Sequence, residues 1–418
     1  MTALAAPVFL AACAVPDGGL FRAERYRDVH LYGVYADRFF SGELPYRDLF
    51  VEYPPGAFAV FLPPAALPAG DYNFAFKSLM AICGLAALFA VILALLSLGV
   101  RGRRLYGAAA LFALSPLAVG PISLNTYDLW PAALTVGALA ALLRRRELLA
   151  SGLLGLAVTA KLYPLVIVPP ALLYVWVGVG RRRALQSLAL LVGVVLLVVL
   201  PFAVLAPGGL WDSFHAQMAR GLQIESLGAA LLLAAHRLGF YDATVVHGAT
   251  RAASRDLAGS LPDALATLLS VLQLVAVALV WIVFVRRGPT AERLVLASAA
   301  VVAAFLVFNR FISPQYLVWL IPLVLLLPGR TGLAALGLLA CSLVLGQIWF
   351  FHYREVFALD RIVWLVVARD AALLALYILL LARLNTSTPS SENTSRHWGL
   401  RRSRASPCAV ARGSQRSA

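Results

Sequence analysis

The feature that most constrains this chain is the recurrence of long apolar runs with few charges. At about 1.5 Å per residue, about 20 residues of helix cross the roughly 30 Å hydrocarbon layer of a bilayer. The strands of a membrane barrel are shorter and alternate in polarity. With 61% hydrophobic and 13% charged residues, the composition does not fit a water-soluble domain. We therefore predict an all-α polytopic membrane protein with about 10–12 transmembrane helices. The clear runs cover residues 74–99, 105–122, 128–143, 184–205, 264–285, 292–308, 315–328, 331–351 and 361–382.

Arginine clusters between these runs predict the topology. By the positive-inside rule, these loops are cytoplasmic. The net charge of +15 comes largely from such clusters and from the last stretch of chain, so it does not indicate nucleic-acid binding. Residues 148–179 lie between two triple-arginine clusters and must cross the membrane an even number of times. Because Pro164 interrupts a helix, we predict two short or re-entrant helices that meet near Lys161 on the outer side. The clusters are Arg101 with Arg103 and Arg104, Arg144 to Arg146, Arg181 to Arg183, and Arg286 with Arg287.

This topology predicts one transmembrane domain over residues 1–383. It has a first outer loop at 16–72 and a large outer loop at 206–263. Residues 384–418 are rich in Ser, Thr and Arg and are expected to form a disordered, basic cytoplasmic tail. Residues 1–15 are apolar but short, and a tilted first helix, a signal-like segment and the remnant of a late start codon all remain open. The four cysteines have the spacing of neither a metal site nor a disulfide framework.

Unusual polar residues gather on the predicted outer face, at helix ends and in outer loops. Ionisable groups near a membrane are costly and often functional, so we expect a shared site at the outer edge of the bilayer. The simpler alternative, that outer loops are polar because they contact water, remains open for each residue. The residues are Asp28, Asp37, Glu52, Asn125, Asp128, Lys161, Glu225, Asn309, Arg310, Gln315 and His352.

Two segments of the outer loops have helical patterns. Aromatic residues after Asp28 recur at helical spacing and predict a short amphipathic helix in the membrane interface, for which Asp28 could serve as a simple cap. Within the large outer loop, Trp211, Phe214, Met218 and Leu222 also recur at helical spacing, which predicts a segment lying along the membrane surface. The outer histidines fit no metal-site spacing.

Short motifs follow one another along the chain in a definite order. Asp28 begins an aromatic-rich helix, which is followed by a turn ending in Pro45-Tyr46 and then by Tyr53-Pro54-Pro55. Further motifs are Asn125-Thr-Tyr-Asp128, Lys161-Leu-Tyr-Pro164, Arg220-Gly-Leu-Gln-Ile-Glu-Ser226 and Ser313-Pro-Gln-Tyr-Leu-Val-Trp319. In order and spacing, residues 26–330 resemble glycosyltransferase family 87, the polyprenyl-phosphate-mannose-dependent mannosyltransferases of the GT-C superfamily.

The resemblance implies a GT-C-like helical bundle that works as a hexosyltransferase. It would take a hexose, mannose in this family, from a polyprenyl-phosphate carrier on the outer face of the cytoplasmic membrane. The acceptor would be a hydroxyl of a glycolipid, glycan or protein. Asp28 matches the family's proposed catalytic carboxylate, a general base, and a single displacement would invert the anomeric carbon. Other GT-C activities, such as transfer of arabinose, glucose or aminoarabinose, or of mannose to protein, remain open.

The remaining site predictions concern substrate binding. Lys161 and Arg310 are candidates to hold the leaving phosphate, although both could instead snorkel from helix ends to lipid headgroups. We expect no cofactor and no metal, because side chains can neutralise a lipid-phosphate donor. The other substrate-binding candidates are Tyr32, Glu52, Tyr53, Asn125, Asp128, Gln223, Glu225 and Gln315.

Two other functional classes are possible. A transporter or flippase of a lipid-linked sugar would also need many helices, but it predicts charges near the bilayer midplane and internal repeats. The charges here cluster at one face and no repeat is evident, which favours an enzyme. A structural membrane protein without chemistry would leave the motifs unexplained.

Overall fold

A computed structural model describes residues 2–16, 28–67, 70–248, 254–352 and 359–386, which lie in one compact unit. Most of the predicted tail lies outside the described residues. Its beginning is helical, since the last helix continues to Thr386 and so ends slightly later than the predicted boundary.

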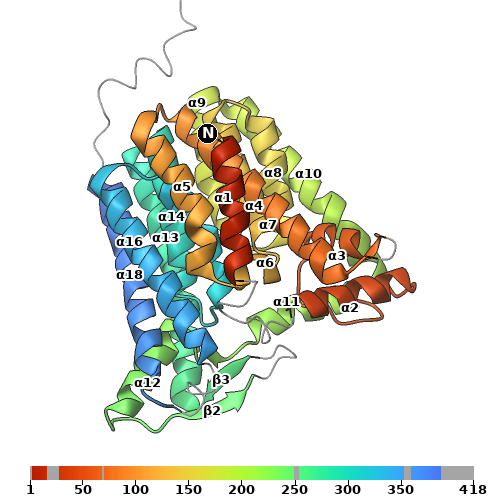
Figure 1. Cartoon of the computed structure of the whole chain (residues 1–418), viewed down its shortest axis with the longest axis vertical. Coiled ribbons are helices and arrows are strands. Elements are labelled where there is room, and N and C mark those ends of the chain that lie inside the picture. Colours follow the sequence, from red (N-terminus) through yellow and green to blue (C-terminus); the bar gives the residue numbers. More distant parts are fainter. Residues whose placement is uncertain (1, 17–27, 68–69, 249–253, 353–358, 387–418) are drawn as a thin grey trace, which may run out of the picture. The chain divides into compact units, whose positions relative to one another are not determined.

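The fold is helical throughout, with one small sheet (Figure 1). Among the described residues, five helices are long and apolar enough to cross a membrane: α4, α10, α13, α16 and α18. The prediction of an all-α polytopic membrane protein is confirmed, and the number of crossings stays a prediction. The helices are α1 (Thr2–Val15), α2 (Asp28–Phe40), α3 (Phe58–Ala65), α4 (Tyr72–Ser97), α5 (Gly102–Val119), α6 (Ile122–Asn125), α7 (Leu129–Leu143), α8 (Glu147–Ala160), α9 (Val168–Val179), α10 (Arg181–Leu205), α11 (Pro207–Met218), α12 (Leu227–Arg237), α13 (Ser260–Arg287), α14 (Ala291–Val307), α15 (Leu320–Leu325), α16 (Gly329–Phe351) and α18 (Val363–Thr386), with 3-10 turns at Pro55–Ala57 (η2), Tyr163–Ile167 (η3) and Pro314–Trp319 (η4).

The two short helices predicted between the arginine clusters are α8 and α9. Helix α8 ends at Ala160, because Lys161 adopts an extended conformation with φ −159° and ψ 148°. The turn η3, with Pro164 at its start, then leads into α9. The break at Lys161 therefore lies where the sequence predicted it.

The core of the bundle is centred on α14. This helix is buried on nearly every side and packs against α13, α15, α18 and η3. Helix α10, in contrast, contacts α8 and α9 along one side and leaves most of its apolar surface exposed. A helix that is apolar all round and exposed is typical of contact with lipid, whereas small residues such as Ala299, Ala300 and Ala303 let neighbours approach α14 closely.

The large outer loop folds into more than the predicted surface helix. Helix α11 covers the first part of the pattern, and Trp211 and Met218 are exposed on it. The prediction was wrong for Leu222, which lies buried in β1 because the chain leaves the helix after Met218. In the described residues, β1 (Leu222–Gln223), β3 (Arg255–Ala258) and β2 (Thr244–His247) form an antiparallel sheet in that order.

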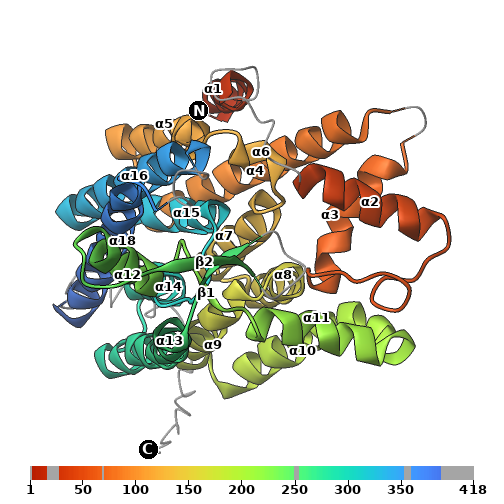
Figure 2. The same cartoon turned by 90° about the horizontal axis from the view of Figure 1, so that it is seen from below.

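These outer segments lie together at one end of the bundle. The strands, α12, α11 and α2 are at the end away from the first residues of α1 (Figure 1). Seen from that end, β1 and β2 lie over the middle of the bundle (Figure 2). The candidate site lies among these segments.

One close contact positions the first outer loop against α8. A Cβ atom added to Gly56 would lie 2.5 Å from Thr159 Oγ1 and 2.6 Å from the Thr159 carbonyl carbon. Only glycine therefore lets η2 rest directly on the last turn of α8. This contact brings Glu52 and Tyr53, just before η2, close to Lys161, just after α8.

We predict that Gly56→Ala lowers the thermal unfolding midpoint of the purified protein, because the added methyl group must displace α8 backbone. Overpacking of this kind costs about 1–3 kcal/mol. Gly152→Ala on α8 is the matched control, since its Cβ would meet no heavy atom of the described residues within 4 Å. The control should match the wild type or exceed it slightly. Equal midpoints for Gly56→Ala and the wild type would contradict the close packing.

Candidate active site

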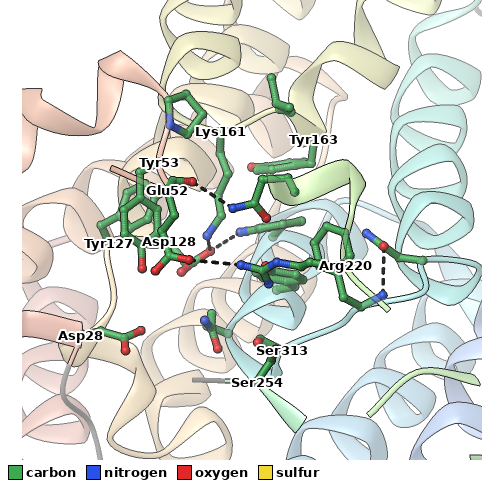
Figure 3. A pocket seen from close by; sticks show the side chains of 18 of the residues that line it. Asp28, Glu52, Tyr53, Tyr127, Asp128, Lys161, Tyr163, Arg220, Ser254 and Ser313 are labelled. Carbon is green, nitrogen blue, oxygen red and sulfur yellow. Dashed lines mark hydrogen bonds and ion pairs between the residues drawn. The ribbon is translucent and has the colours of Figure 1, made fainter. Parts of the chain in front are cut away.

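A cavity of about 480 Å³ lies among the outer segments, within the usual size range of small-molecule sites (Figure 3). Its walls come from α2, the loop before η2, the start of α7, the end of α8, α11, β1 and η4. Nine of the eleven predicted site residues line it: Asp28, Tyr32, Glu52, Tyr53, Asp128, Lys161, Gln223, Glu225 and Gln315.

Two predicted residues lie outside the lining of this cavity. The buried side chain of Asn125 donates a hydrogen bond to the Pro121 carbonyl at 2.8 Å. The guanidinium of Arg310 donates to the Met218 carbonyl, and the Arg310 carbonyl accepts from the Gln223 amide at 3.0 Å. In this structure, therefore, Arg310 supports the wall of the cavity from behind.

An ion pair of Lys161 with Asp128 lies in the wall of the cavity. The distance from Nζ to Oδ1 is 2.6 Å, and the Asp128 side chain is only 1% exposed. Trp319 Nε1 donates to the same oxygen at 2.7 Å. Asp128 precedes the first residue of α7 and Lys161 follows the last residue of α8, so each charge lies at the helix end whose dipole favours it.

Aromatic rings surround the Lys161 ammonium on its other sides. Its Nζ lies 4.5 Å from the centre of the Tyr127 ring, 5.0 Å from Tyr316 and 5.1 Å from Trp319, which are cation–π distances. Tyr163 stacks on Trp319 at 4.0 Å between ring centroids. Burial lowers the pKa of Lys161, and the neighbouring Asp128 opposes this shift. We call this group of Lys161, Asp128 and the four rings the lysine box.

A second ion pair joins Arg220 to Glu52 across the cavity, at 3.2 Å between Nη2 and Oε2. The Gln217 side chain also donates to the Glu52 carbonyl at 3.1 Å, and the Arg220 guanidinium lies 4.8 Å from the centre of the Phe311 ring. Burial raises the pKa of Glu52, while Arg220 opposes this shift. The pair ties the large outer loop to the first outer loop.

Sequence reasoning missed Arg220 as a site residue. Its motif was recognised, and Gln223 and Glu225 were chosen from the same stretch. Arginine serves nearly every basic position in this chain, so its residue type carried no signal, and its partner Glu52 is 168 positions away. The rings of the lysine box were also not selected, although Tyr127, Tyr163, Tyr316 and Trp319 all lie within the recognised motifs.

Asp28 lies at the first residue of α2, set apart from the lysine box (Figure 3). Burial raises the pKa of its carboxyl to about 7, with further increases from Glu52 and Asp128 and an opposing effect from Lys161. Helix α2 is held in place by Tyr32, whose ring stacks on Phe61 at 4.2 Å and meets Tyr127 edge-on at 5.7 Å. These ring contacts therefore position the helix that carries the carboxyl, and burial holds the pKa of this carboxyl near 7.

The cavity can also receive hydroxyl groups. Asp128 Oδ2 and Gln223 Oε1 are buried acceptors without a hydrogen-bond partner among the described residues. Buried acceptors of this kind are costly when left unsatisfied, so a ligand that supplies O–H or N–H donors fits them. No group of three or more His, Cys, Asp or Glu side chains in the described part of the chain is arranged to hold a metal ion.

Residues 50–314 match the family model of glycosyltransferase family 87. The chain belongs to glycosyltransferase family 87. This confirms the resemblance drawn from the order of the motifs, and it makes the chain a membrane glycosyltransferase, which uses a sugar donor and an acceptor. No curated protein matches the chain. The matched range of this family 87 member includes Glu52, the lysine-box residues Asp128 and Lys161, and Arg220, while Asp28 and α18 lie outside it.

The lysine box should be a cooperative unit of this family 87 enzyme. Asp128→Ala leaves the buried Lys161 without its counter-ion, and we expect a loss of about 3–5 kcal/mol in the free energy of unfolding. The double variant Asp128→Leu with Lys161→Met removes both charges and should unfold closer to the wild type. The measurement is thermal unfolding of the wild type, Asp128→Ala and the double variant in detergent micelles.

Glu43→Ala is the control, because it breaks the Arg38–Glu43 pair, which is much more exposed to solvent than the Lys161–Asp128 pair. Its expected loss is at most about 1 kcal/mol. If Asp128→Ala were no more destabilising than Glu43→Ala, or if the double variant were at least as destabilised as Asp128→Ala, the box would not be a coupled ion pair.

Proposed function

We propose that the enzyme transfers a hexose, mannose, from a polyprenyl-phosphate carrier to an acceptor hydroxyl, with inversion and with Asp28 as the general base. The observation that carries the proposal is a carboxyl with a pKa of about 7 in the lining of a cavity that is also lined by Lys161 and Arg220. A general base works best when its pKa lies near the operating pH. Family 87 membership supports the glycosyl-transfer chemistry.

The transfer is a single displacement. Asp28 takes the proton of the acceptor hydroxyl as its oxygen forms a bond to the anomeric carbon of the donor. The bond from this carbon to the phosphate oxygen breaks, and its electron pair stays on the polyprenyl phosphate. Because phosphate is a stable leaving anion, no second carboxyl is needed to protonate it, unlike in a glycosidase. Attack opposite to the leaving group inverts the anomeric carbon.

Lys161 and Arg220 are the cations we assign to the leaving phosphate. Both line the cavity, and each is already oriented by a carboxylate, Asp128 and Glu52 respectively. Preoriented charge in a partly dry site stabilises a developing anion without reorganisation. Arg220 takes the role that the sequence had given to Arg310, since Arg310 points its guanidinium at the Met218 carbonyl. We infer that neither a metal nor an organic cofactor takes part.

We place the site on the outer face of the cytoplasmic membrane. The arginine clusters follow the ends of α4 and α7, form the last two residues of α13 and begin α10, whereas the cavity lies toward the other ends of these helices. By the positive-inside rule the clusters face the cytoplasm. A lipid-linked donor and a glycolipid, glycan or protein acceptor would then meet at the outer edge of the bilayer.

We predict that Asp28→Asn lowers transfer of labelled mannose from polyprenyl-phosphate mannose by about 10²-fold or more, because the amide cannot accept the proton. The assay uses membranes with matched protein levels and their endogenous acceptors. Asp37→Asn is the matched control, since Asp37 is exposed on the same helix. It should transfer at the wild-type rate. Equal transfer by Asp28→Asn and the wild type would remove Asp28 from the mechanism, whereas movement of the intact lipid-linked sugar without transfer would point to the flippase alternative.

The pH profile should report the Asp28 carboxyl. Its pKa is raised, so below about pH 7 the carboxyl is protonated and cannot act as a base, and the rate should fall about tenfold per pH unit below that value. Glu52→Gln removes a negative charge that raises this pKa, so its acid limb should move to lower pH. The measurement is transfer rate against pH for both proteins. If the wild-type rate did not change between pH 5 and pH 7, the assignment of Asp28 as the general base would be contradicted.

A further inference from the structure

The last described helix carries two charged residues in its apolar interior. Arg369 and Asp370 of α18 are 0% and 3% exposed. A buried charge inside a membrane-spanning helix is costly, and such residues are usually functional and paired. Both residues lie within the apolar run at 361–382, so neither belongs to the predicted site. They also lie outside the residues matched by the family model.

The contacts of Arg369 point toward the cavity. Its Nε pairs with Asp370 Oδ1 at 2.9 Å, and its guanidinium lies 5.6 Å from the centre of the Trp349 ring on α16. Its Nη2 donates a hydrogen bond to the backbone carbonyl of Glu225. Glu225 lines the cavity, whereas Arg369 does not. The guanidinium thus touches the outer wall of the site from behind.

The wall that Arg369 touches is residues 222–226, where strand β1 leads into a turn closed by the Ser226 amide, which donates to the Gln223 carbonyl at 2.9 Å. The Gln223 amide donates to the Arg310 carbonyl and the Ile224 amide donates to the Arg255 carbonyl, each at 3.0 Å. Ser226 then begins α12, accepting a hydrogen bond from the Ala229 amide. Gln223 and Glu225, on either side of this turn, both line the cavity, while Ile224 between them is buried in the core.

We propose that Arg369 is a positioning residue, which fixes the Glu225 backbone and thereby holds Gln223 and Glu225 at the substrate. Asp370 orients the guanidinium for this task. A guanidinium can donate to a carboxylate and to a carbonyl at the same time in fixed directions, which a lysine ammonium in its place does less well. The segment is held by the Arg310 carbonyl, the Arg255 carbonyl of β3 and the Arg369 guanidinium of α18, so loss of the α18 contact frees the side nearest Glu225.

The first test is independent of the proposed sugar transfer. In a full-length protein whose four cysteines are replaced by alanine, we would introduce Gln223→Cys and measure its rate of modification by a small water-soluble thiol reagent. Arg369→Lys should raise this rate by about tenfold or more, because the segment opens locally more often. Ser313→Cys, on another wall of the cavity, should react at an unchanged rate. Arg383→Lys, at an exposed position of α18, is the matched control.

The second test asks whether the placement of Gln223 and Glu225 by Arg369 matters for catalysis, and it rests on the proposed function. Arg369→Lys should reduce kcat/KM for transfer by about 10- to 100-fold, as misplacement of binding groups by about 1 Å does. The pH at which the rate falls should stay unchanged, because Asp28 is untouched. The double variant Arg369→Leu with Asp370→Leu, which leaves no buried charge, should show the same kinetic loss in a folded protein.

The two tests distinguish failure of the positioning role from failure of the proposed function. Unchanged labelling of Gln223→Cys in Arg369→Lys, or an equal rise at both labelled positions, would overturn the positioning role. A selective rise at Gln223→Cys with wild-type kcat/KM would also overturn it, since the segment would then move without consequence. If the wild type transfers no mannose, the proposed function fails, and the labelling still decides whether Arg369 holds the segment.

Discussion

A lysine ammonium buried at the end of a helix can stay charged only if its surroundings replace water, and this requirement organises the cavity. Asp128 supplies the opposite charge at 2.6 Å, and the faces of Tyr127, Tyr316 and Trp319 supply the remaining electrostatic contact. These groups come from the start of α7, the break after α8 and the turn η4. The ion pair therefore ties together three segments that are far apart in the sequence, and the other walls of the cavity are built around it.

The outer loops reach this centre through contacts that tolerate little change. The first outer loop rests on α8 at Gly56, and α11 rests on the backbone of the same loop at Gly209, where an added Cβ would lie 1.6 Å from the Tyr46 carbonyl oxygen. Arg220 then links the end of α11 to Glu52. Loops that might otherwise move independently become walls of one site. Rigid walls suit a reaction in which a base, an acceptor hydroxyl and a leaving phosphate must be aligned.

The carboxyl groups of the cavity differ in their electrostatic surroundings. Asp128 and Glu52 are each matched by a cation, so their charges serve to orient Lys161 and Arg220. Asp28 lies apart from these pairs, and burial together with the two other carboxylates raises its pKa to about 7. Carboxyls in one site thus differ in role because their surroundings differ, which is a recurring device of enzymes that use acid–base chemistry near neutral pH.

The sequence by itself determined the membrane class, the break at Lys161, the helix that begins at Asp28 and the family, because each depends on local composition or on the order of short motifs. Nine of the eleven residues predicted from it line one cavity, since the order of the helices collects alternate helix ends and the loops between them at one end of the bundle. Only the tertiary structure decided that Arg220 faces the cavity while Arg310 turns away, that aromatic rings enclose Lys161, and that α18 reaches Glu225. Those facts depend on which side chains meet across long separations in the chain, and neither residue type nor spacing encodes the direction in which a side chain points once the helices have packed.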